Sequence, residues 1–404
     1  MRKLPERKQE TLYNDRFLPA ETIKLRKKFR AFAEKELFPR AYDIGQKREA
    51  NENFPLDLFK SMAKKDFFKV AFSKKDGGLG LKYPACASAV LAEEMAYISA
   101  SFAGSVNAHF LLSGRSLSFG SAFIKKKYLK PLLECDMIGS FAMTEPQSGS
   151  DVRSESLTTR ARKRGGNYIV NGQKRYITNA GVSDFIATLV NLNGKSCMLV
   201  IDTNSKGCRT SEPDKKLGNR GELTYDIYFD NVSVPKENLI GKEGDGLRIC
   251  IAALMYGRTG IGASGVGMAQ SAFDETVSFL NEREAFGRKI SRFQHWQFLL
   301  AERAVEIENA RNLYIKSALS IDSGNPFPVV ESSGAKLYGS RLAVDMARDA
   351  VQAFGGLGLM VELGHDESTY KVEEIYRDAK VGEIYEGSNE IHRMVIAREI
   401  FGNQ

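Results

Sequence analysis

The sequence predicts an α+β protein made of three parts. These are an N-terminal helical domain over residues 1–136, a middle antiparallel β domain over residues 137–245 and a C-terminal helical bundle over residues 246–404. Two observations lead to this prediction: helical segments in both outer thirds, and short β-rich runs around Asn-Gly pairs between them. A chain of 404 residues is also long for a single hydrophobic core, which favours two or three packed domains.

Two segments carry the predicted N-terminal helices. In Ala20–Leu37, apolar residues recur at helical spacing among Lys, Arg and Glu, which predicts an amphipathic helix. Cys86–Ala100 is apolar with few charges, which predicts a helix buried on most of its sides. A glycine-rich break over residues 77–80, followed by Pro84, separates this second helix from what precedes it.

The middle part has the residue pattern of an antiparallel sheet. β-rich runs flank Asn171-Gly172 and again Asn193-Gly194, and an Asn-Gly pair is the strongest short hairpin signal in a sequence. Tyr225–Pro235 alternates once more between apolar and polar residues.

The last third predicts long helices. They are expected over Leu247–Glu282, Phe293–Ser323, Phe327–Phe354 and Asn389–Phe401, with Gly402 placed where a helix C-cap belongs.

Composition excludes several classes of protein. No run of about 18 apolar residues stands out, so we expect no membrane span. The N-terminus lacks the apolar core of a signal peptide, and the five cysteines form no CxxC pair. These features indicate reduced thiols in the cytoplasm, or in the mitochondrial matrix of a processed eukaryotic chain. The four histidines show no ligand spacing, so we expect no metal.

The formal net charge of +8 leaves three interpretations open. A solvated surface is the default, because Lys and Arg are spread along the whole chain. An anionic small substrate is compatible with the charge, and a nucleic-acid partner is the weakest interpretation.

Residues 260–265, GIGASG, match the GxGxxG pattern of dinucleotide-binding folds. No strand precedes them and they lie inside a predicted long helix, so we interpret them as small residues that let helices approach closely.

Several polar motifs are weak when each is taken alone. FAMTEPQSGSD (Phe141–Asp151) offers hydroxyls and backbone N–H groups, and NGQKRYITNA places Tyr176 and Thr178 on one side of a strand. Arg283 beside Phe286, with Gln294 further on, suits a pyrophosphate and an adenine, and QAFGGLG places glycines at a helix end. YRDAKVGEIYEGSNEIHR contains four carboxylates: Asp378, Glu383, Glu386 and Glu390.

Taken together, the motifs are specific. MTEPQSGSD, NGQKRYITNA, KLGNRGELTYDIYFDNVSVP, EREAFGRKI, QAFGGLG and YRDAKVGEIYEGSNEI occur in the order and approximate spacing of the acyl-CoA dehydrogenase flavoenzymes. The resemblance runs from about Thr22 to Phe401, and its pattern is most similar to short-chain, butyryl-CoA-type members. It implies a β-barrel-like middle domain and a C-terminal four-helix bundle.

The resemblance also implies a non-covalent FAD between the β domain and the C-terminal helices. Some of the implied FAD-binding residues would reach the FAD of a partner subunit, namely Arg283, Phe286, Gln294 and residues 352–356. The resemblance therefore implies a homo-oligomer, usually a tetramer. The complete implied cofactor set is Phe141, Met143, Thr144, Gly149, Ser150, Tyr176, Thr178, Arg283, Phe286, Gln294, Gln352, Gly355, Gly356, Ser388 and Glu390.

In such enzymes the residue matching Glu386 removes the α-proton of an acyl thioester. Hydride leaves the β-carbon for flavin N5, a trans-2-enoyl thioester forms, and electrons pass to electron-transfer flavoprotein. Donors to the thioester carbonyl stabilise the enolate-like charge, and the family uses the Glu386 backbone N–H and a ribityl hydroxyl. Ser150, Arg258 and Gly387 match substrate-site positions, and Asp378, Glu383 and Glu390 are interpreted as structural or surface charges.

Some positions depart from the family pattern. Gly257 matches a helix position where other branches carry the base, which leaves Glu386 without a rival. Tyr176 replaces a usual tryptophan beside the flavin, so transfer to the usual electron acceptor is less certain. No arginine lies near Ser101 to bind a distal carboxylate. Asn107 and Arg115 lie in the same region, so a polar ω-group on the substrate stays an open alternative.

Three alternatives stay open. The same dehydrogenation on a carrier-protein-bound acyl or aminoacyl group is a close one. An oxidase that uses O₂ would usually have a longer chain. A DNA-binding relative without dehydrogenase activity is suggested only by the charge, and the retention of Glu386 speaks against it.

Overall fold

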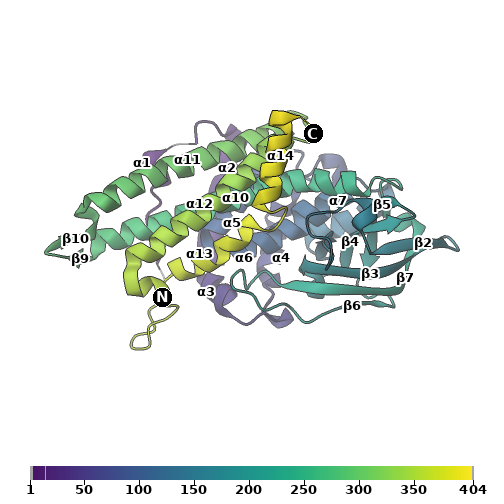
Figure 1. Cartoon of the computed structure of the whole chain (residues 1–404), viewed down its shortest axis with the longest axis horizontal. Helices are drawn as coiled ribbons and strands as arrows, with labels where there is room; N and C mark the ends of the chain where they lie inside the picture. The colour runs from purple at the N-terminus through teal and green to yellow at the C-terminus, as the bar shows by residue number, and fades with distance from the viewer. Residues whose placement is uncertain (1–2, 14, 403–404) are drawn as a thin grey trace.

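The computed structural model describes residues 3–13 and 15–402. The chain folds in the predicted order, with helices first, then a sheet, then a bundle of long helices, so the α+β prediction is confirmed. Figure 1 shows the sheet at one end of the molecule and the long C-terminal helices extending away from it.

The N-terminal part is helical. The predicted helix Ala20–Leu37 is α2 (Ala20–Phe32) continued by a π-helical turn (Ala33–Leu37). The predicted apolar helix is α5 (Pro84–Ile98), which starts on its proline and is buried from Ala85 to Ile98. The other helices are α1 (Gln9–Leu12), α3 (Phe38–Gln46), α4 (Leu56–Lys64), α6 (Ala100–Val106) with a π-helical extension (Asn107–Gly114), α7 (Arg115–Leu117), α8 (Ala122–Ile124) and α9 (Lys130–Glu134).

The sheet has eight strands and is antiparallel for the most part. Its order is β6-β7-β3-β2-β4-β5-β8, with β1 paired to β4 off this path. The pairs β1–β4 and β2–β4 are parallel, which the sequence pattern did not predict. The strands are β1 (Gly139–Ala142), β2 (Arg160–Arg164), β3 (Asn167–Thr178), β4 (Phe185–Leu192), β5 (Lys195–Asp202), β6 (Cys208–Thr210), β7 (Thr224–Pro235) and β8 (Leu239–Ile240).

One of the two predicted hairpins is confirmed and the other is wrong. Asn193 and Gly194 join β4 to β5 with φ of 51° and 84°, the left-handed pair that a tight hairpin turn needs. Asn171-Gly172 instead lies inside β3, where the pairing with β7 shifts register after Val170. Gly172 has φ +143°, and a Cβ there would lie 2.5 Å from Thr159 Cα, so the glycine forms a bulge rather than a turn.

The C-terminal part contains the predicted long helices and one helix that was not predicted, α13. The elements are α10 (Gly246–Glu282), the short hairpin β9 (Glu284–Ala285) and β10 (Arg288–Lys289), α11 (Gln294–Asp322), α12 (Val329–Phe354), α13 (Val372–Ala379) and α14 (Asn389–Phe401). Figure 1 places the β9–β10 hairpin at the end of the molecule opposite the sheet.

Helix α10 is the central element of the C-terminal part. It is long and apolar enough to pass a test for a membrane-spanning helix, contrary to the expectation that no such run exists. However, 89% of its apolar window is buried inside the protein, as in the core helix of a globular fold.

The glycine-rich residues 260–265 lie inside α10 and not after a strand, as interpreted from the sequence. A Cβ on Gly265 would lie 2.4 Å from the Gly339 oxygen of α12, and one on Gly339 would lie 2.5 Å from the Gly262 oxygen. These glycines therefore let the two helices pack backbone to backbone.

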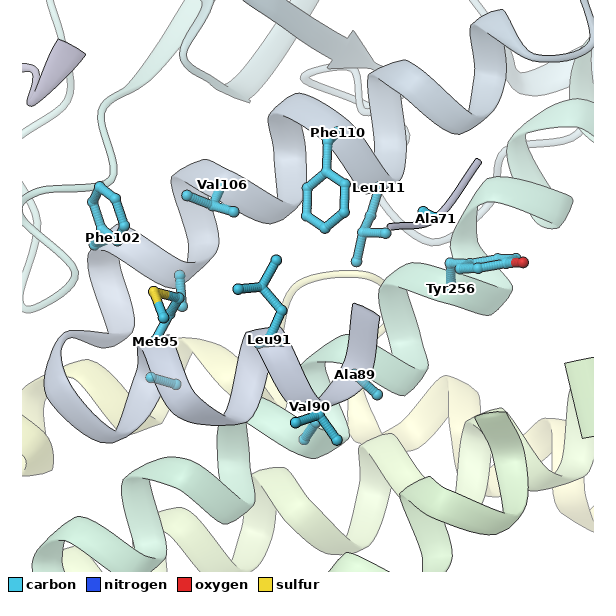
Figure 2. Close-up of a cluster of buried hydrophobic side chains, with 14 of the residues drawn as sticks. Ala71, Ala89, Val90, Leu91, Met95, Phe102, Val106, Phe110, Leu111 and Tyr256 are labelled. Atoms are coloured by element: carbon cyan, nitrogen blue, oxygen red, sulfur yellow. The ribbon is translucent and has the colours of Figure 1, made fainter. Parts of the chain in front are cut away.

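The helical core lies where α5, α6 and α10 meet. Figure 2 shows Leu91 of α5 facing Val106 and Phe110 of the next helix, with Tyr256 of α10 close by. Leu91, Val106 and Phe110 are at most 1% exposed. This apolar layer supports the helix whose other face reaches the site described below.

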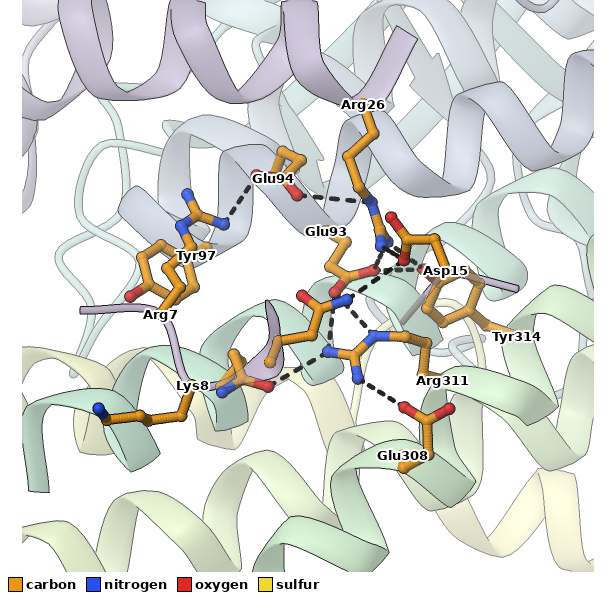
Figure 3. Close-up of polar contacts among 12 residues, drawn as sticks. Arg7, Lys8, Asp15, Arg26, Glu93, Glu94, Tyr97, Glu308, Arg311 and Tyr314 are labelled. Carbon is orange, nitrogen blue, oxygen red and sulfur yellow. Dashed lines mark hydrogen bonds and ion pairs between the residues drawn. The ribbon is translucent and has the colours of Figure 1, made fainter. Parts of the chain in front are cut away.

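A buried ionic cluster ties the N-terminal helices to the C-terminal bundle (Figure 3). Glu93 of α5 pairs with Arg26 of α2 at 2.5 Å and with Arg311 of α11 at 3.1 Å. Burial opposes ionisation of Glu93, but the two arginines outweigh it and hold its pKa below the usual range. Removing one partner would leave buried charge uncompensated, so the cluster fixes how the three helices pack.

Candidate active site

A pocket lies between the sheet and the helices. Its wall is formed by the end of β1 with the loop after it, the end of β3, helices α6 and α10, and the loop before α14. The lining residues are Gly104, Asn107, Ala108, Leu112, Phe141, Met143, Thr144, Gly149, Ser150, Val152, Tyr176, Ile177, Thr178, Glu222, Leu254, Arg258, Ile261, Tyr385, Glu386, Gly387 and Ile391.

The pocket brings together ten of the residues selected from the sequence. They come from segments far apart in the chain, and each lines the same cavity. They are Phe141, Met143, Thr144, Gly149, Ser150, Tyr176, Thr178, Arg258, Glu386 and Gly387.

The other predicted residues lie outside this lining. Arg283, Phe286 and Gln294 are exposed near the β9–β10 hairpin, and Phe286 is 94% exposed. Gln352, Gly355 and Gly356 are exposed at the end of α12. A single chain therefore leaves both groups facing outward.

Ser388 and Glu390 lie just beyond the pocket. Ser388 is the N-cap residue of α14, although its side chain makes no capping hydrogen bond to the helix. Glu390 is exposed and pairs with Arg393 at 2.8 Å.

A buried ion pair holds the loop after β1 in place. Lys174 of β3 and Glu145 of the loop are both fully buried and lie 2.8 Å apart. Glu145 also accepts hydrogen bonds from the backbone of Thr158 and Thr159, and Lys174 donates to the Met143 oxygen at 3.0 Å. These contacts fix Met143 and its neighbours against the end of β3.

Tyr176 is set by an irregularity in β3. The pairing with β7 shifts between Lys174 and Ile177, and Tyr176 has φ 58°. Its side chain is 64% exposed although it lines the pocket. An aromatic side chain exposed in a pocket is a suitable surface for a flat ring system.

Glu386 lies in the loop between α13 and α14, in a conformation that L residues rarely adopt. Its φ is 53° and that of Gly387 is 97°. Such strain persists only where the surroundings hold it, and it is commonest at functional sites. A Cβ on Gly257 of α10 would lie 2.1 Å from Glu386 Oε2, so this glycine leaves the space that the carboxylate occupies.

The carboxylate of Glu386 is poorly solvated. Its Oε2 is buried, and no hydrogen-bond partner lies near it in the part of the chain that the structure describes. Burial raises the pKa of Glu386 to about 8, while Arg258 and Lys336 act in the opposite direction. A carboxyl with this pKa ionises near pH 8, and its carboxylate is then a stronger base than that of an exposed glutamate.

Two cations hold the backbone of this loop. Arg258 Nε donates to the backbone carbonyl oxygen of Glu386 at 3.2 Å. Lys336 of α12 donates from Nζ to the Gly387 oxygen at 2.7 Å and to Asn389 Oδ1 at 3.0 Å. Burial lowers the pKa of Lys336 to about 8, and the Glu386 carboxylate partly opposes that effect.

The other carboxylates of the same stretch are placed differently. Asp378 is buried outside the pocket and accepts a hydrogen bond from the Asn219 backbone at 2.6 Å. Burial raises its pKa to about 7. Glu383 pairs with Lys380 at 2.5 Å. Glu386 is the one of the four that lines the pocket.

Sequence reasoning missed Lys336 and Glu222. Lys336 is a buried cation of α12, and nothing in its local sequence separates it from a solvent-exposed lysine on a helix. Glu222 lies within a motif that was recognised, KLGNRGELTY, and was not singled out. It is 5% exposed and lines the pocket.

The residues at the pocket suit a flavin. Phe141, Met143 and Tyr176 offer apolar and aromatic surface, and Thr178 adds a hydroxyl beside them. A Cβ on Gly149 would meet nothing within 4 Å, so the loop leaves open space there. Across the described residues, no group of three or more His, Cys, Asp or Glu side chains could hold a metal ion.

Fold and site together are those of an oxidoreductase whose helix–sheet–helix architecture encloses the buried Glu386 carboxylate, with its Oε2 lacking a hydrogen-bond partner among the described residues. The chain belongs to the acyl-CoA dehydrogenase family. Models of the N-terminal, middle and C-terminal domains of acyl-CoA dehydrogenase match residues 19–136, 140–232 and 244–401. Members are FAD-dependent flavoproteins of fatty acid β-oxidation, and a tetramer is typical of the family.

Known proteins resemble the chain over almost its whole length. It is 37% identical to an acyl-CoA dehydrogenase of Bacillus subtilis, covering 95% of this chain and 98% of the relative. It is 35% identical to a short-chain specific acyl-CoA dehydrogenase of Clostridium acetobutylicum, covering 93% and 97%.

Solved structures agree with these relatives. Butyryl-CoA dehydrogenase from Megasphaera elsdenii superposes with a TM-score of 0.86 at 30% identity, covering 95% of this chain and 98% of that one. A glutaryl-CoA dehydrogenase from Mycobacterium smegmatis in complex with FADH2 gives 0.89 at 25% identity, covering 98% of each chain.

Proposed function

We propose that the protein dehydrogenates an acyl-CoA thioester between its α and β carbons to give the trans-2-enoyl-CoA, with Glu386 as the base. One observation carries this proposal: the buried and unpaired Glu386 carboxylate faces a pocket lined by the residues that match the family's flavin and substrate positions. The three-domain division at residues 136 and 245 belongs to the same proposal, supported by strands that run from Gly139 to Ile240.

The chain's own residues supply the proton chemistry. An α C–H next to a thioester is weakly acidic, so its base needs a pKa raised towards neutrality and a fixed position. Burial gives Glu386 a pKa of about 8, and Gly257 leaves it room. Arg258 and Lys336 hold the loop backbone on either side, which orients the carboxylate without an ion pair to it.

FAD is the cofactor in this proposal. Phe141, Met143, Tyr176 and Thr178 would hold it in this chain, with Gly149 and Ser150 at the loop. When bound, FAD supplies the acceptor for the hydride that leaves the β-carbon. The exposed Arg283, Phe286, Gln294, Gln352, Gly355 and Gly356 would contact the cofactor of a second subunit, with Ser388 and Glu390 beside the first subunit's pocket.

The partners follow from the same assignment. A second copy of the chain would cover the outward-facing residues, and we propose a homotetramer because a tetramer is typical of the family. Electron-transfer flavoprotein is the proposed acceptor of the electrons. The cytoplasm, or the mitochondrial matrix for a processed eukaryotic chain, is the proposed compartment, and the relatives include a mitochondrial enzyme of Mus musculus.

An anaerobic titration of the purified flavoprotein tests the function. The panel runs from butyryl-CoA to palmitoyl-CoA and includes isobutyryl-, isovaleryl- and glutaryl-CoA, and the flavin absorbance is recorded. We expect prompt bleaching by short straight chains, lost in Glu386→Gln. In the wild type, kcat/KM should rise with pH towards a plateau above about 8, because the free base must be ionised.

Two results would contradict the proposal. If only acyl groups bound to a carrier protein bleach the flavin, the substrate is a carrier-protein thioester and not an acyl-CoA. A protein that cannot be loaded with FAD would remove the proposed chemistry altogether.

A further inference from the structure

We infer that Glu222, together with Asn107, forms a polar subsite in the pocket that selects acyl groups carrying a protonated amine. The inference rests on the proposed function, because the selected group is part of the acyl thioester. Four steps support it: the setting of Glu222, the lack of a counter-ion, the space made for its carboxylate, and the unused amide of Asn107.

Glu222 is held in place by two neutral donors. It lies between β6 and β7 and is 5% exposed. Thr178 Oγ1 donates to its Oε1 at 3.0 Å, and Asn219 Nδ2 donates to its Oε2 at 3.0 Å. A carboxylate has about four acceptor positions, so these two bonds orient the group and leave acceptor capacity over.

No counter-ion neutralises this carboxylate. Among the described residues, no Lys, Arg or His nitrogen lies within the 4.0 Å of an ion pair with Glu222. Lys216 attracts it only at longer range, and the Lys216 Nζ is itself buried without a hydrogen-bond partner. Burial accordingly raises the pKa of Glu222, and Lys216 lowers it only in part. A buried carboxylate in this state gains most from a cation that a ligand brings.

The helix opposite Glu222 leaves room for its carboxylate. A Cβ on Gly104 of α6 would lie 2.2 Å from Glu222 Oε2, so any larger residue there would displace the group. Gly104 and Glu222 both line the pocket, and so does Asn107 one helical turn further on.

Asn107 adds a second unsatisfied polar group to the same wall. It is 2% exposed, and its Nδ2 has no hydrogen-bond partner among the described residues. The two ends of an amide exchange by a half-turn of the side chain, so its oxygen is also available as an acceptor. Apart from these residues, this part of the wall is mainly apolar, with Ala108, Leu112 and Leu254.

The polarity of the subsite opposes an acidic substrate. Arg115, at the C-terminal end of the helical segment that carries Asn107, does not line the pocket: it donates to the Ala71 backbone oxygen at 3.2 Å and lies over the Tyr256 ring at 4.4 Å. Arg258 is the cation among the lining residues, and its Nε is bonded to the Glu386 backbone oxygen. Glu222 would therefore repel a carboxylate carried by the acyl chain into this part of the pocket. A protonated amine would be attracted.

A matched pair of substrates tests the inference in the FAD-loaded enzyme. The pair is 4-(dimethylamino)butyryl-CoA, protonated at neutral pH, and its neutral isostere 5-methylhexanoyl-CoA. Their kcat/KM ratio is measured in the wild type, in Glu222→Gln and in Glu237→Gln, which removes an exposed carboxylate. The matching S-alkyl-CoA thioethers, which lack the carbonyl, report binding by calorimetry independently of turnover.

We expect the wild type and Glu237→Gln to prefer the amine over the isostere by about tenfold or more, in kcat/KM and in binding. In Glu222→Gln both preferences should fall towards one. Equal losses for both substrates in Glu222→Gln, or a wild-type preference for the isostere, would overturn the subsite and reduce Glu222 to a positioning residue for Thr178.

The design separates this failure from that of the proposed function. If no acyl-CoA reduces the flavin, the proposed function fails, and the thioether affinities still decide whether the pocket selects a cation. If butyryl-CoA reduces the flavin but Glu222→Gln leaves both ratios unchanged, only the subsite is overturned.

Discussion

At the residue scale, burial of the ionised Glu386 carboxylate lowers the stability of the folded protein, and this loss can be measured. Its folded pKa of about 8 lies above the ordinary glutamate value of 4.5. The folded protein therefore binds this proton more tightly than the unfolded chain, and stability is lost as pH rises from the unfolded pKa through the folded one.

Glu386→Gln should therefore stabilise the apoprotein while abolishing dehydrogenation. The gain in Tm over the wild type should be small near pH 5 and largest at pH 8 and above. Thermal denaturation across that range measures it. A gain that does not depend on pH would mean that the folded pKa is not raised.

The sequence predicted that Glu386, Arg258 and Gly387 share one site, but it did not predict the buried charges Lys336 and Glu222 beside them. The motif around Glu386 is local, so it could be recognised from letters. Lys336 and Glu222 act through distant contacts, to Gly387 in one case and to Thr178 in the other. A charged residue in a helix or loop is usually solvated, and only the fold shows that these two are buried.

Lys336 offers a second test at the residue scale. It donates to the Gly387 oxygen and holds the Glu386 pKa down. Lys336→Met should lower kcat/KM and move the midpoint of its pH profile above about 8, the value for the wild type. A loss of activity with an unchanged midpoint would assign Lys336 to loop packing alone.

At the element scale, the close approach of α10 to the loop before α14 decides whether the base fits. Gly257→Ala would place a methyl 2.1 Å from Glu386 Oε2 and 2.8 Å from Leu112 Cδ2. The helix tolerates alanine, so the side chains must move instead of the backbone.

We expect Gly257→Ala to reduce kcat/KM by about 10²-fold, because a shift of about 1 Å in a reacting group costs that much. Its Tm should stay near that of the wild type. Gly334→Ala on α12 is the matched control, since a Cβ there meets nothing within 4 Å. Equal activity in both variants would show that the carboxylate is not confined by α10.

The pairing of the strands also explains why the hairpin predicted at Asn171-Gly172 does not form. Asn171-Gly172 carries a hairpin signal, but β3 pairs with β2 on one side and β7 on the other through this point. Sheet pairing on both sides outweighs a local turn preference, and the glycine is used for a bulge against Thr159. Asn193-Gly194 faces no such competition and forms the turn.

At the scale of the whole molecule, the order of helix, sheet and helix was predictable because hydrophobic periodicity persists over long segments. The arrangement of these parts was not, because it depends on glycine contacts between α10 and α12 and on the buried pairs of Glu93. The site depends on that arrangement, since its residues come from all three parts of the chain.

A single chain also leaves part of the predicted cofactor set unused, which leads to a prediction on assembly. Phe286 has φ 53° and is 94% exposed at the end of the molecule away from the sheet. A large aromatic side chain held outward in a left-handed conformation indicates a binding role, since exposure and strain both cost stability. In the proposed oligomer Phe286 would contact the FAD of a second subunit.

Phe286→Ala should therefore leave the Tm of the apoprotein close to that of the wild type but weaken the retention of FAD. The flavin content after dialysis and the mass from analytical ultracentrifugation measure the two effects. Phe17→Ala is the matched control, because Phe17 is also exposed, at 68%, and lies outside the predicted cofactor set. If the protein is monomeric with FAD fully bound, or if both variants lose flavin equally, then Phe286 does not reach a partner's cofactor and the site is complete within one chain.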